Sequence, residues 1–104
     1  MDRVAMLKEV LAANPNDAFA RYGLAMEYSN AGQTEDALRE FGELLKAHPD
    51  YAAGYFMAAQ TLDRASRTEE ACTMLHNGIA AAQRTRNSHA QSEMQAMLEE
   101  LESR

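Results

Sequence analysis

The sequence contains no tryptophan, one cysteine and only two prolines among its 104 residues. The single cysteine, Cys72, excludes a disulfide within the chain, so the simplest expected compartment is the cytoplasm. β-Branched aliphatic residues are limited to Val4, Val10 and Ile79, which disfavours an extended sheet. No apolar run approaches the roughly 18 residues of a membrane-spanning helix. Residues 1–4 also lack the basic and then apolar layout of a signal peptide.

Negatively charged residues outnumber positively charged ones. Sixteen acidic residues against ten Lys and Arg leave a formal net charge of −6. Because this charge repels phosphate groups, neither nucleic acid nor an anionic membrane is expected as a partner. The share of apolar residues is 46% and that of charged residues 25%, as in ordinary globular proteins. The chain length then predicts one small domain, residues 1–104.

The residues that are abundant predict an all-α fold. Alanine, glutamate, leucine, methionine and arginine dominate, and all of them favour helices. Apolar residues recur every three or four positions, as in Phe41, Leu44 and Leu45. Caps and spacing predict helices at 2–13, 17–30, 34–47, 50–64, 68–84 and from 88 onward. The inward stripes are expected to contain Val4, Leu7, Val10, Leu11, Ala37, Leu38, Phe41, Cys72, Leu75, Ile79, Ala90, Met94, Met97, Leu98 and Leu101. The expected N-caps are Thr34, Asp50, Thr68 and Ser88.

The chain matches itself at a lag of 34 residues. Pro15 and Pro49 are separated by this distance. The segment Thr34-Glu35-Asp36-Ala37 likewise aligns with Thr68-Glu69-Glu70-Ala71, at the same place in the helix pattern. A fixed period of this kind is typical of helical repeats, which stack because one hairpin cannot bury its apolar face alone.

These residues resemble the tetratricopeptide repeat family, whose 34-residue pattern is W-x2-L-G-x2-Y, then A-x3-F, then P. In residues 18–51, Arg21 takes the tryptophan place, and the other places are filled by Leu24, Ala25, Tyr28, Ala37, Phe41 and Pro49. In residues 52–85 the match is looser, with Tyr55 in the tryptophan place and Gln83 in the proline place. The resemblance implies a short α-solenoid of antiparallel hairpins. Its predicted parts are a half repeat at 1–15, repeats at 18–51 and 52–85, and a capping helix at 88–103.

The resemblance also implies a function. In this family a second face of each first helix lines a concave groove that binds partner peptides. We therefore expect a non-catalytic interaction module or scaffold that binds a protein or peptide. The matching groove positions are Phe19, Tyr22, Met26, Asn30, Phe56, Met57, Gln60 and Arg64. Two alternatives remain open: the face forms a homodimer, or the last helix covers Phe56 and Met57 as core.

Signals for catalysis or for a metal site are weak. His48, His76 and His89 have no His or Cys partner at metal-ligand spacing, and there is no glycine-rich phosphate loop. Cys72 falls on an inward stripe, as a small buried hydrophobic residue does. No enzyme activity, metal or cofactor is therefore expected. Two sets of charged residues are interpreted as solvent-exposed surface. The acidic set consists of Asp36, Glu40 and Glu43. The basic set, which alternatively forms a local basic edge, consists of Arg64, Arg67, Arg84 and Arg86.

Overall fold

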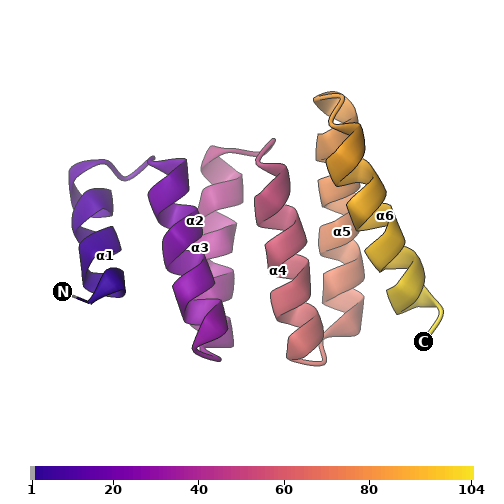
Figure 1. Ribbon diagram of the computed structural model, residues 1–104, viewed down its shortest axis with the longest axis horizontal. Helices are drawn as coiled ribbons and strands as arrows, with labels where there is room; N and C mark the ends of the chain where they lie inside the picture. The colour runs from indigo at the N-terminus through magenta and orange to yellow at the C-terminus, as the bar shows by residue number, and fades with distance from the viewer. Residues whose placement is uncertain (1) are drawn as a thin grey trace. The chain divides into compact units, whose positions relative to one another are not determined.

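The computed structural model describes residues 2–104, and Met1 of the predicted half repeat lies outside the described residues. Within residues 2–104 there are six helices and no strand, which confirms the all-α prediction (Figure 1). The helices are α1 (Arg3–Ala13), α2 (Ala18–Asn30), α3 (Thr34–Ala47), α4 (Ala52–Arg64), α5 (Thr68–Arg84) and α6 (Ser88–Glu102).

The chain divides into two compact units, Met1–Pro49 and Asp50–Arg104. In the first unit, α2 packs against both α1 and α3. In the second unit, α5 packs against α4 and α6 (Figure 1). Helix α4 also contacts α6.

The core of the first unit begins at the interface of α1 and α2. Leu7 and Leu11 of α1 are buried with Ala20 and Leu24 of α2, and Val4 and Tyr28 pack against this cluster. On the other side of α2, Phe41 of α3 is only 1% exposed. The prediction for Val10 is wrong, because its side chain lies beside the buried stripe and is 39% exposed.

An ion pair occupies the tryptophan place of the first repeat. Nη1 of Arg21 on α2 donates to Oε1 of Glu40 on α3 at 2.8 Å. Arg21 Nη2 donates to the Pro15 carbonyl oxygen at 3.0 Å. The prediction that Glu40 belongs to a solvated face is therefore wrong, since Glu40 is 8% exposed. Its burial is tolerated because the guanidinium supplies an opposite charge and a hydrogen bond.

The core of the second unit is tightest around Gly78 of α5. A Cβ atom at this position would lie 2.5 Å from Met94 Sδ of α6 and 2.6 Å from Tyr55 Cβ of α4. The missing side chain thus allows the three helices to approach one another. Leu75 and Ile79 are buried on the same helix, as predicted, whereas Cys72 is only half-buried.

The helix starts differ from the predicted caps by one residue. At three turns the chain adopts a positive φ, at Gly32, Ser66 and Arg86. The residue after each one donates its N–H to a carbonyl five positions earlier, as Arg67 does to Leu62 at 2.9 Å. This Schellman arrangement is so short that its last residue is also the N-cap of the next helix. The N-caps are therefore Gln33, Arg67 and Asn87, in place of the predicted Thr34, Thr68 and Ser88, and Tyr51 replaces Asp50.

Candidate functional site

The first candidate surface is one face of α2, made by Phe19, Tyr22, Met26 and Asn30. These residues follow one another at spacings of three and four, so they project from the same side of the helix. Phe19 is 75% exposed, and Asn30 is also exposed. Tyr22 and Met26 are half-buried. We call this set the α2 face. It is uncharged and contains three large apolar or aromatic side chains.

Tyr22 links the α2 face to the core. Its ring meets the ring of Phe41 edge to face, with the centroids 6.4 Å apart and the planes at 68°. Such pairs stabilise by about 0.5–1.5 kcal/mol beyond the apolar area that they bury. One edge of Tyr22 therefore belongs to the hairpin of α2 and α3, while Phe19, one turn earlier, does not share this support.

The second candidate surface is a groove between α4 and α6, which we call the α4–α6 groove. Its volume is about 430 Å³. The lining residues are Phe56, Gln60, Asp63, Arg64, Ala96, Met97, Glu100 and Leu101. Phe56, Met57 and Gln60 are half-buried and Arg64 is exposed. The last helix therefore borders the predicted α4 face and leaves a hollow beside Phe56.

One end of the α4–α6 groove is apolar and the other is charged. Arg104 Nη1 donates to Asp63 Oδ1 at 2.7 Å, and Arg104 Nη2 donates to Glu100 Oε1 at 2.7 Å. The hydrogen bond to Glu100, followed by the one to Asp63, raises the pKa of Arg104 above its ordinary value. The side chain of Asp63 is 22% exposed and that of Arg104 is 49% exposed. The guanidinium thus joins the two acidic residues across the groove end.

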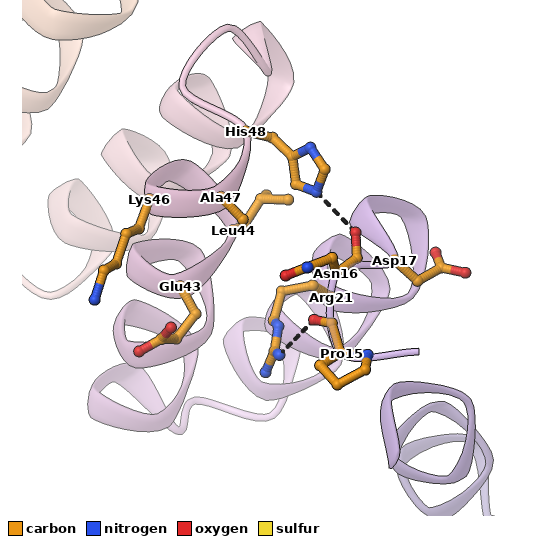
Figure 2. Close-up of a pocket in the computed structure, with 9 residues that line it drawn as sticks. All are labelled: Pro15, Asn16, Asp17, Arg21, Glu43, Leu44, Lys46, Ala47 and His48. Atoms are coloured by element: carbon orange, nitrogen blue, oxygen red, sulfur yellow. Dashed lines mark hydrogen bonds between the residues drawn. The ribbon is translucent and has the colours of Figure 1, made fainter. Parts of the chain in front are cut away.

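A cavity of about 390 Å³ lies in the first unit, where the turn between α1 and α2 meets the end of α3 (Figure 2). The Arg21 guanidinium donates to the Pro15 carbonyl, and Nε2 of His48 lies 2.8 Å from the Asn16 carbonyl oxygen. Because a carbonyl only accepts, the His48 nitrogen must be the donor. Figure 2 shows both bonds converging on the turn. The cavity residues thus hold this turn against α2 and α3.

Within residues 2–104, no group of three or more His, Cys, Asp or Glu side chains is placed to hold a metal ion. Two of the arginines interpreted as surface charge are in ion pairs, Arg67 with Glu70 at 2.6 Å and Arg84 with Asp50 at 2.9 Å. No helix in this part of the chain combines the length and the apolar character needed to cross a bilayer.

Sequence reasoning missed five of the eight residues that line the α4–α6 groove. The residues that line it but were not among the expected binding residues are Asp63, Ala96, Met97, Glu100 and Leu101. The available signal was the apolar stripe of the last helix, where Met97 is half-buried and Leu101 is 3% exposed. This stripe was expected to face the core, and part of it faces the groove.

Comparisons with known proteins agree with this architecture. A tetratricopeptide repeat-containing protein of Pseudomonas aeruginosa is 27% identical over 96 residues, which cover 92% of this chain and 91% of that protein. A tetratricopeptide repeat domain protein from Salinibacter ruber superposes with a TM-score of 0.80 at 31% identity, over 86% of this chain and 91% of that one. PcrH, solved in complex with the chaperone-binding region of PopD, shares the fold, with a TM-score of 0.88 at 18% identity over 96% of this chain and 76% of that one. Residues 1–57 match the family described as Tetratricopeptide repeat. The chain therefore belongs to the tetratricopeptide repeat family.

Proposed function

We propose that the chain is a non-catalytic module that binds an apolar or amphipathic segment of a partner protein. The contact surfaces would be the α2 face and, on the second unit, Phe56, Met57, Gln60 and Arg64. The observation that carries the proposal is Phe19, a large apolar side chain that is 75% exposed. Water contact with such a side chain is unfavourable, and a partner that covers it gains the corresponding burial energy.

The neighbours of Phe19 support the same role. Tyr22 and Met26 extend the apolar area along α2, and both are half-buried. Methionine adapts its shape to different apolar partners, and aromatic residues frequently dominate binding energies at interfaces. The fold neighbour PcrH binds a segment of another protein, PopD. A cytoplasmic location stays a prediction from the sequence.

The experiment that tests the proposal places a photo-crosslinking amino acid at Phe19. Benzoylphenylalanine resembles phenylalanine, and the exposed site accommodates its extra ring. The matched control carries the same group at Glu43, an exposed position of α3. After irradiation in cells of the source organism, we expect a crosslink to another protein from position 19 and none from position 43.

The same experiment separates the alternatives. A crosslink from position 19 to a second copy of the chain alone would favour a homodimer through the α2 face, and light scattering on the purified protein would then show a dimer. Equal crosslinking from Phe19 and Glu43, or none from either, would contradict a specific role for the α2 face.

A further inference from the structure

The α4–α6 groove has the size and polarity to select among partner segments. A volume of about 430 Å³ falls within the range of small binding sites. Its apolar walls include Phe56 on α4 and Met97 on α6, and its charged end contains Asp63 and Glu100 together with the neighbouring Arg64. Along α4, Phe56 and Asp63 are separated by two helical turns, or about 10 Å. A segment that fills the groove therefore meets apolar surface first and carboxylates about 10 Å further on.

Arg104 already occupies the charged end. Besides its two bonds of 2.7 Å, its Nη2 lies 3.5 Å from Asp63 Oδ2, so the guanidinium spans both oxygens of that carboxylate. Arg104 lies beyond the last residue of α6, Glu102, and its side chain is half-exposed. Holding this long, half-exposed side chain in one conformation beyond the end of α6 costs conformational entropy, which offsets part of the Coulomb attraction. This contact is therefore open to displacement.

We propose that the α4–α6 groove binds a partner segment in which a large apolar side chain is accompanied by an arginine, and that Arg104 competes with this arginine for Asp63 and Glu100. The inference rests on the proposed function and specifies the partner. The apolar side chain packs against Phe56 and Met97. The partner guanidinium then takes the place of the Arg104 guanidinium. The planar shape of a guanidinium allows it to bind both oxygens of a carboxylate at once.

The geometry sets the spacing within the partner. A segment in the extended polyproline II conformation advances about 3.1 Å per residue with about three residues per turn, so an arginine about three positions after the apolar residue lies on the same side. A helical segment advances about 1.5 Å per residue, so the separation is about seven positions. The competition sets a second expectation: removal of Arg104 frees both carboxylates and increases the affinity for the partner.

The test uses random dodecapeptides displayed on phage and selected on the full chain. Enriched peptides are then synthesised, and their dissociation constants are measured by fluorescence polarisation. We expect an apolar residue and an arginine at one of the two spacings. Asp63→Asn is expected to weaken binding about tenfold, and Arg104→Ala to strengthen it about three- to tenfold. Asp50→Asn is the matched control, because Asp50 also pairs with an arginine, Arg84 at 2.9 Å, but does not line the groove.

The outcomes distinguish failure of this inference from failure of the proposed function. Peptides that lack arginine, or whose affinity depends on Phe19 or Phe56 but not on Asp63, would overturn the inference and leave the proposed function intact. Failure to enrich any peptide would contradict both. If Asp63→Asn lowers the melting temperature, Glu100→Gln and Arg104→Ala decide the question, because their side chains are more exposed. Unchanged affinity in both of these variants would overturn the inference.

Discussion

Gly78 is the position where one added methyl group tests the packing of the second unit most severely. In Gly78→Ala the new Cβ atom would lie 2.5 Å from Met94 Sδ and 2.6 Å from Tyr55 Cβ. Non-bonded carbon atoms prefer separations of about 3.5–4.0 Å. The Met94 side chain can rotate away, because methionine is flexible. Tyr55 Cβ is attached directly to the backbone, so α4 and α5 must move apart.

The size of the effect follows from two opposing terms. Overpacking a core costs about 1–3 kcal/mol, and contact on two sides places this site at the upper end. Replacement of glycine by alanine inside a helix stabilises the folded state by about 1 kcal/mol. The net expectation is a loss of about 2 kcal/mol, which lowers the melting temperature by about 8–16 °C in a domain of this size.

The matched control is Gly42→Ala on α3. Gly42 is exposed, and an added Cβ would meet no described atom within 4 Å. The free energy of unfolding of this variant is therefore expected to rise by about 0.5–1 kcal/mol. Both variants are compared with the parent protein by thermal unfolding, which is monitored by far-ultraviolet circular dichroism. If Gly78→Ala melts at or above the parent temperature, the close approach of α4, α5 and α6 is incorrect.

Three further predictions test the first unit and the turns. Phe41→Ala should lower the free energy of unfolding by about 3–5 kcal/mol, measured by urea denaturation, because Phe41 is 1% exposed. A nearly unchanged urea midpoint would contradict its burial. Glu40→Leu should cost about 2 kcal/mol by leaving Arg21 without its 2.8 Å partner, and adding Arg21→Met should recover most of this loss in a double-mutant cycle. Ser66→Gly should raise the stability by about 0.5–1 kcal/mol in the same assay, since Ser66 has a φ of 62°; a loss would contradict this backbone conformation.

The repeat pattern predicted the helices well because it records packing within each hairpin. Small residues such as Ala25 and Ala37, both fully buried, and apolar residues such as Phe41 occupy the expected inward places. Three caps were displaced by one residue, after Gly32 as well as after Ser66 and Arg86, because the Schellman turn ends on the residue before the Thr or Ser that side-chain preference favours as a cap.

Contacts between distant residues were less accessible to sequence reasoning. Glutamate is a residue type that is usually found on the surface, and only the approach of Arg21 from α2 makes the burial of Glu40 possible. The α4–α6 groove similarly depends on how α6 is placed relative to α4, which no periodicity within one helix determines. The exposure of Phe19 was predicted more directly, because its position on α2 lies away from Leu24.

The central claim is that the partly exposed apolar faces of α2 and α4 serve binding rather than folding. The most direct measurement follows the backbone amide signals of the isotope-labelled chain by nuclear magnetic resonance during titration with a phage-selected peptide. The account predicts that the largest shifts cluster around Phe19, Tyr22 and Met26 on α2, or around Phe56 and Gln60 on α4. Shifts concentrated on α1 or α5, with both of these faces unchanged, would contradict it.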